Sequence, residues 1–77
     1  MNMSLFDLNE GETATIYKLL LKGDICKRLK NLGLIEGTKV ECLHKAPSGD
    51  PTAYLIRGAV IAIRNEDSGK ISVFKER

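Results

Sequence analysis

Apolar and polar residues alternate along much of the chain, and this alternation predicts strands that each bury one face. Ala14 and Ile16 alternate with polar neighbours in the first such segment, and Val40 and Cys42 do so in the second. The segments predicted as strands are residues 12–20, 38–45, 52–57, 60–64 and 71–74. About five short strands in so short a chain favour a mainly β fold, a small curled barrel, because closure removes exposed sheet edges.

Residues 24–32 are the segment with clear helical spacing. Their apolar stripe recurs at i, i+4 and i+7 and consists of Ile25, Leu29 and Leu32. Asp24 is the predicted N-cap, because its carboxylate can accept hydrogen bonds from the N–H groups of the first turn. Gly33 is predicted in the left-handed position that ends the helix, with Leu34 folding back onto the last turn. One short helix is therefore expected between the first two strands.

Glycine and proline mark the turns between these segments. Gly37 predicts a turn before the second strand, and the run from Pro47 to Pro51, with Gly49 and Asp50, predicts the next hairpin loop. Residues 65–69 predict another loose turn. Near the start of the chain, Leu5 and Leu8 are one helical turn apart, so a short turn is expected to cover the core.

Length and composition restrict the functional class. The 77 residues predict a single domain from 1 to 77, and the net charge of +2 is too small to indicate a nucleic-acid or membrane ligand. The longest apolar run, residues 59–63, is far shorter than the roughly 18 residues of a membrane-spanning segment. With two cysteines and no signal-peptide pattern, the sequence predicts a cytoplasmic protein in a reducing environment.

Catalytic and metal-binding patterns are sparse. His44 is the only histidine in the sequence, and no nucleophile elbow or phosphate-binding loop occurs, so the prediction is a non-enzymatic protein. Cys42 and His44 are two residues apart on a predicted strand, which places both side chains on one face. They are candidate ligands for a transition metal, but a third ligand is missing. Cys42 also fits a small core residue, so we expect no cofactor and at most weak or transient Fe²⁺ binding.

Basic residues concentrate around the predicted helix. Residues 18–30 contain five lysines and arginines against one aspartate. If the apolar stripe packs inward, Lys27, Arg28 and Lys30 face solvent. An ordinary solvated face explains this pattern, and so does a patch that steers an acidic protein partner. Both interpretations stay open at this stage.

Several motifs occur in order along the chain: Leu5-x2-Leu8-x2-Gly11 with Ile16, Arg28-Leu29-x2-Leu32-Gly33-Leu34-x2-Gly37-x2-Val40, Ala46-Pro47-x-Gly49-Asp50-Pro51 and Ala62-Ile63-Arg64 with Ile71-x-Val73. Together they resemble the FeoA family, the small cytoplasmic component of bacterial ferrous iron uptake. The resemblance implies an SH3-like barrel. One departure is Ser68-Gly69, where the family usually carries an alanine-containing helical turn; glycine favours a looser turn there.

The resemblance also implies a partner. Its function would be that of an accessory protein that docks on and modulates the cytoplasmic GTPase region of a FeoB-type iron transporter, without inserting into the membrane. The residues predicted to contact this partner are Lys27, Arg28, Lys30, Pro47, Gly49, Asp50 and Pro51. Two alternatives remain: a small barrel that binds nucleic acid, and a free-standing relative of the C-terminal domain of iron-dependent repressors. Sparse aromatic residues speak against the first.

Overall fold

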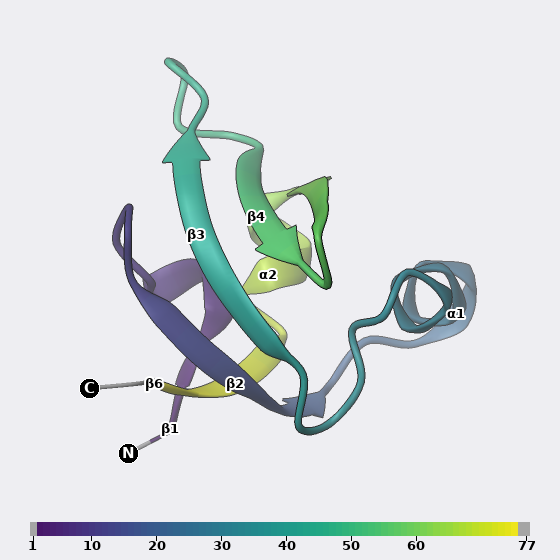
Figure 1. Ribbon diagram of the computed structural model, residues 1–77. Coiled ribbons are helices and arrows are strands. Elements are labelled where there is room, and N and C mark those ends of the chain that lie inside the picture. Colours follow the sequence, from purple (N-terminus) through teal and green to yellow (C-terminus); the bar gives the residue numbers. More distant parts are fainter. Residues whose placement is uncertain (1, 76–77) are drawn as a thin grey trace.

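A six-stranded antiparallel sheet curls around one core in the computed structural model, which describes residues 2–75 (Figure 1). The strands are β1 (Asn2–Ser4), β2 (Thr13–Leu19), β3 (Lys39–Lys45), β4 (Thr52–Ile56), β5 (Ala59–Ile63) and β6 (Ile71–Lys75). A 3-10 turn η1 (Leu5–Asp7) and two helices, α1 (Gly23–Asn31) and α2 (Asn65–Ser68), complete the described elements. The predicted mainly β fold is confirmed.

The strand order is β1-β6-β2-β3-β4-β5, so β1 and β5 lie at the two ends of the sheet. The prediction of about five strands missed β1. Three residues are too few to show an alternating pattern, and β1 is a strand because it pairs with β6 from Asn2↔Phe74 to Ser4↔Ser72. This pairing places the described ends of the chain side by side, on the side of the sheet away from α1 (Figure 1).

The buried faces are those that the alternation predicts. Ala14 and Ile16 from β2 and Val40 and Cys42 from β3 are almost fully buried. The core also contains Leu5, Leu8, Leu21, Leu29, Leu34, Tyr54, Ile56, Ile63, Ile71 and Val73. Burial raises the pKa of the Tyr54 phenol, whose hydroxyl donates a hydrogen bond of 3.3 Å to the carbonyl of Leu5. The turn η1 is thereby attached to the core.

The end of α1 follows the sequence prediction. Gly33 has a φ of +107°, and its N–H donates to the Lys30 carbonyl at 3.0 Å, while the Leu34 N–H reaches the Leu29 carbonyl at 3.0 Å. These two bonds form a Schellman motif, and Leu34 is fully buried behind it. Gly37, with a φ of +90°, makes the turn into β3 as predicted.

Two predictions about α1 were wrong in detail. The helix begins at Gly23 with Lys22 as its N-cap residue, so Asp24 lies in the first turn and does not cap it. Its negative charge there still favours the positive end of the helix dipole. Leu32 is the C-cap residue and is 45% exposed, because the stripe turns away from the core as the helix ends.

The loose turn predicted over residues 65–69 is also wrong, because residues 65–68 form α2. The Asp50 carboxylate, from the β3–β4 loop, accepts a 3.0 Å hydrogen bond from the Asn65 N–H in the first turn of α2. Ser68 is fully buried and its hydroxyl donates to the Asn65 carbonyl at 3.3 Å. The tertiary hydrogen bond from Asp50 and the local one within α2 outweigh the low helix propensity of this segment.

Candidate partner-binding site

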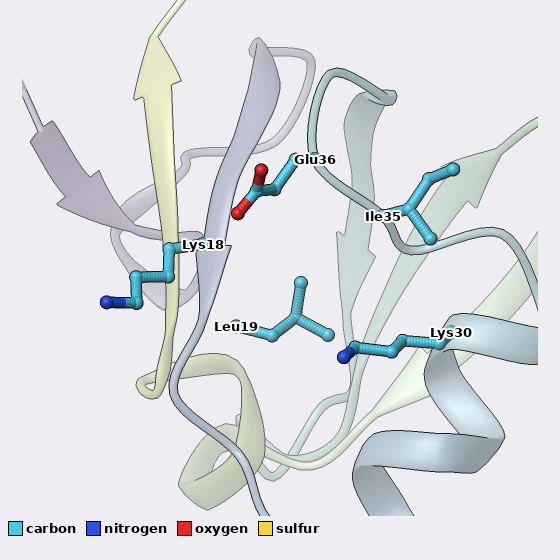
Figure 2. Close-up of a pocket in the computed structure, with 5 residues that line it drawn as sticks. All are labelled: Lys18, Leu19, Lys30, Ile35 and Glu36. Atoms are coloured by element: carbon cyan, nitrogen blue, oxygen red, sulfur yellow. The ribbon is translucent and has the colours of Figure 1, made fainter.

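A cleft of about 540 Å³ opens between α1, the end of β2 and the segment that leads into β3. We call it the helix cleft; its lining consists of Lys18, Leu19, Lys30, Ile35 and Glu36. Figure 2 shows Leu19 and Lys30 pointing toward one another across the cleft, while the ammonium of Lys18 points away. The Glu36 carboxylate points toward β2. The cleft thus combines an apolar floor with charges of both signs.

The helix cleft exists because β2 and β3 separate. Their register runs only from Thr13↔Glu41 to Thr15↔Lys39, and two further backbone hydrogen bonds connect Ile16 to the turn at residues 37–38. Beyond that point β2 has a register irregularity against β6, between Ile16 and Lys18. The chain then leaves the sheet to form α1 and returns through Ile35 and Glu36.

A second cleft, of about 390 Å³, lies on the other side of α1. We call it the strand cleft; it is lined by Ile25, Arg28, Leu29, Leu32, Ile61, Ala62, Ile63, Arg64, Glu66 and Asp67. Its walls are α1, the edge strand β5 and the start of α2. The helix is therefore flanked by two open clefts. Its solvent-facing residues lie in the helix cleft, in the strand cleft or on the exposed outer face of the helix.

The three predicted steering charges are distributed among these surroundings. Lys30 lines the helix cleft, Arg28 lines the strand cleft, and Lys27 is exposed and lines neither. At about 100° per residue, Lys27 and Lys30 lie about 60° apart around the axis of α1, whereas Arg28 lies about 100° or more from either of them. They make α1 positive over a wide angle and do not form one flat patch.

The predicted hairpin residues lie elsewhere. The loop from Pro47 to Pro51 is at the far end of β3 from α1 (Figure 1) and lines neither cleft. The Asn65 side-chain amide donates to the Gly49 carbonyl at 2.7 Å, and the Asp50 carboxylate accepts from the Asn65 backbone. These groups stabilise α2, so the structure does not combine the hairpin and the helix into one site.

Cys42 and His44 do not share a face, contrary to the expectation from strand periodicity. Cys42 pairs with Tyr54 and His44 with the adjacent residue Ala53, so a bulge at Leu43 shifts the register between them. Cys42 is fully buried, whereas His44 is exposed. Burial raises the pKa of the Cys42 thiol and disfavours the thiolate that binds metals. Within residues 2–75 no group of three or more potential metal ligands is present.

Leu19, Ile35 and Glu36 line the helix cleft, although the sequence pattern does not predict them as site residues. A signal for Leu19 was present, because the alternation fails in the run from Leu19 to Leu21, where Leu20 is 58% exposed. Ile35 directly follows the buried Leu34 and is 44% exposed, a position that periodicity cannot assign in so short a connection.

No described helix is long and apolar enough to span a membrane.

Known proteins place this fold in a family. The curated Fe(2+) transport protein A/Fe(2+) transporter FeoB fusion protein of Porphyromonas gingivalis is 32% identical over 71 residues, which cover 92% of the chain and 8% of the fusion protein. The chain therefore spans only a small part of that relative. Among solved structures, the FeoA protein of Chlorobium tepidum has a TM-score of 0.94 at 29% identity, covering 97% of this chain and 71% of that one.

The FeoA protein of Stenotrophomonas maltophilia, solved in complex with zinc and described as a prokaryotic SH3 domain protein, has a TM-score of 0.82 at 26% identity. The alignment covers 97% of this chain and 96% of that one, which confirms the expected SH3-like fold. The FeoA domain itself matches residues 3–75, nearly the whole sequence. This chain therefore belongs to the FeoA domain family, whose named relatives are proteins of ferrous iron transport.

Proposed function

We propose that the chain is a non-enzymatic accessory protein of ferrous iron uptake, which binds the cytoplasmic part of a FeoB-type transporter and modulates it. The observation that carries this proposal is the Porphyromonas gingivalis relative, in which transport protein A and the FeoB transporter form one polypeptide. Fusion in one chain is what a functional association between two separate proteins predicts. The cytoplasm is then the compartment in which the chain acts.

The charge distribution around α1 supports the same function. Lys27 and Lys30 project from one side of α1 and Arg28 from another, so an approaching acidic surface is attracted from a wide range of angles. Such charges raise the association rate more than they slow dissociation. Partly exposed apolar residues beside the helix, such as Leu19 and Ile35 in the helix cleft, supply apolar surface for the contact that follows the encounter.

Charge reversal on α1 tests this function. We expect Lys27→Glu/Lys30→Glu to lower the association rate with the purified cytoplasmic GTPase domain of the transporter about tenfold at low salt, and to flatten its salt dependence. The control is Lys70→Glu, which changes an exposed lysine between α2 and β6, outside both clefts. Unchanged kinetics together with full iron-dependent growth of a strain that carries only the double variant would contradict the proposal.

A further inference from the structure

The helix cleft continues into a neighbouring cleft of about 520 Å³. We call this second part the aromatic cleft; its lining consists of Thr15, Ile16, Tyr17, Lys18, Glu36, Gly37 and Phe74. The two clefts share Lys18 and Glu36, so they meet at these residues. Together they form one groove along the second half of β2, which we call the β2 groove.

Each part of the β2 groove offers exposed apolar side chains. In the aromatic cleft, Tyr17 and Phe74 pack edge to face with ring centroids 4.8 Å apart, and each ring remains about two-fifths exposed, at 45% and 41%. In the helix cleft, Leu19 and the 44% exposed Ile35 both contribute to the lining, and the Ile35 side chain points away from Leu19 (Figure 2). A pair of aromatic rings held against one another loses little conformational entropy when a partner binds, which favours such residues as anchors.

The charges of the groove indicate the chemistry of its occupant. Two lysines, Lys18 and Lys30, line it against one carboxylate, that of Glu36. A nucleic acid would place its phosphates along the full length of the groove and would meet Glu36 at the junction. A peptide can avoid this repulsion, because it can place an uncharged or hydrogen-bond-donating side chain beside the carboxylate. Acidic side chains on the same peptide complement the two lysines.

We propose that the β2 groove binds an acidic amphipathic segment of a protein partner, with apolar side chains against Tyr17–Phe74 and Ile35 and carboxylates beside Lys18 and Lys30. This inference rests on the proposed function when the segment belongs to the cytoplasmic domain of the transporter. According to this proposal, the partner contacts only the side of α1 that borders the β2 groove. It does not contact the strand cleft or the edge strand β5.

Variants on the two sides of α1 test this assignment. We expect Tyr17→Ala and Ile35→Ser each to raise the Kd for the purified GTPase domain about tenfold, measured by calorimetry, with thermal unfolding confirming that each variant is folded. Matched controls are Val60→Ser, which changes a large hydrophobic residue of β5 that is 65% exposed, and Lys70→Glu. Both controls are expected to keep the wild-type Kd within about twofold. Full binding by both groove variants would overturn the inference and leave the proposed function intact.

A second probe separates the groove from the identity of the transporter. A synthetic peptide with leucines at helical spacing and glutamates beside them should shift the amide resonances of Tyr17, Leu19 and Ile35, whereas the same peptide with lysines should not. Such shifts would support the groove even if the GTPase domain failed to bind, which would refute only the proposed function. No shift with the acidic peptide, or tighter binding of single-stranded RNA than of the peptide at these residues, would overturn the inference.

Discussion

The Schellman motif that ends α1 and buries Leu34 requires a left-handed backbone conformation at position 33, which Gly33 adopts. At a φ of +107° a side chain is strained, since L-residues pay about 1–2 kcal/mol in this region. A Cβ would also lie 2.6 Å from the Cδ of Arg57, but that flexible side chain can move away. The conformational cost therefore decides the effect of a substitution.

We expect Gly33→Ala to lower the free energy of unfolding by about 1–2 kcal/mol, measured by urea denaturation. The matched control is Gly69→Ala, since Gly69 has a φ of −65°, and its added Cβ would meet the Asn65 carbonyl at 3.4 Å, a tolerable contact. The control should change stability by less than about 0.5 kcal/mol. Equal effects at both glycines would show that the cap contributes nothing special.

The two cysteines differ in environment although neither forms a disulfide. Cys42 is fully buried with a raised pKa, whereas Cys26 on α1 is partly exposed. We therefore expect the Cys26 thiol to react quickly with a disulfide reagent at pH 8. The Cys42 thiol should react only as fast as the protein unfolds. Cys26→Ser should abolish the fast phase. Two fast thiols would mean that the core around Cys42 opens readily.

At the scale of the element, α1 is attached to the curled sheet mainly through Leu29, the buried member of its apolar stripe. We expect Leu29→Ala to cost about 2–4 kcal/mol of unfolding free energy, because it leaves a cavity. Leu32→Ala on the same helix is the control and should cost less than about 1 kcal/mol, since Leu32 is nearly half exposed. A similar loss for both variants would show that Leu32 also contributes to the core.

The elements recovered from sequence are those whose signal is local. The alternation around Ala14 and Val40 predicted two strands and their buried faces, and Gly33 predicted the end of the helix. The observed bounds agree with these predictions within a residue or two. The elements that were missed depend on distant partners: β1 needs β6, and α2 needs the Asp50 carboxylate from another loop. No local pattern contains that information.

The candidate site was predictable only in part for a similar reason. Basic residues on α1 are visible in the sequence, but their separation between two clefts depends on where β5 and β2 pass the helix. The bulge after Cys42 moves His44 to the other face, and a single inserted residue leaves no trace in the alternation that precedes it. Ile35 and Glu36 become site residues only because β2 and β3 separate beside them.

At the scale of the whole molecule, backbone pairing joins segments that are far apart in the sequence, and an ion pair with an acid-sensitive member adds to the pairing of β2 with β6. Glu12, just before β2, contacts Lys75 at the end of β6. The hydrogen bond from Lys75, followed by one from the Asn9 backbone, lowers the pKa of Glu12. Because the folded pKa is depressed, this pair stabilises the fold at neutral pH, and its contribution is lost as the pH falls below about 4.5 and through the folded pKa.

We expect Lys75→Met to raise the pKa of Glu12 toward the ordinary glutamate value, as followed by carbon NMR of its carboxylate. When the pH is lowered from 7 to below about 4.5, the free energy of unfolding of the variant should fall less than that of the wild type, because the ion pair that acid disrupts is already absent. Lys70→Met provides the comparison, because Lys70 lies outside this pair. An unchanged Glu12 pKa in Lys75→Met would contradict the assignment.

The adjacent ends of the chain have a consequence for tethering. β1 and β6 pair with one another on the side of the sheet away from α1, so the described ends of the chain do not lie over the helix (Figure 1). A short flexible tether supplies an effective concentration in the millimolar range. A contact too weak to persist between free molecules would then stay largely formed, so a fused chain needs far less intrinsic affinity at α1 than a free one.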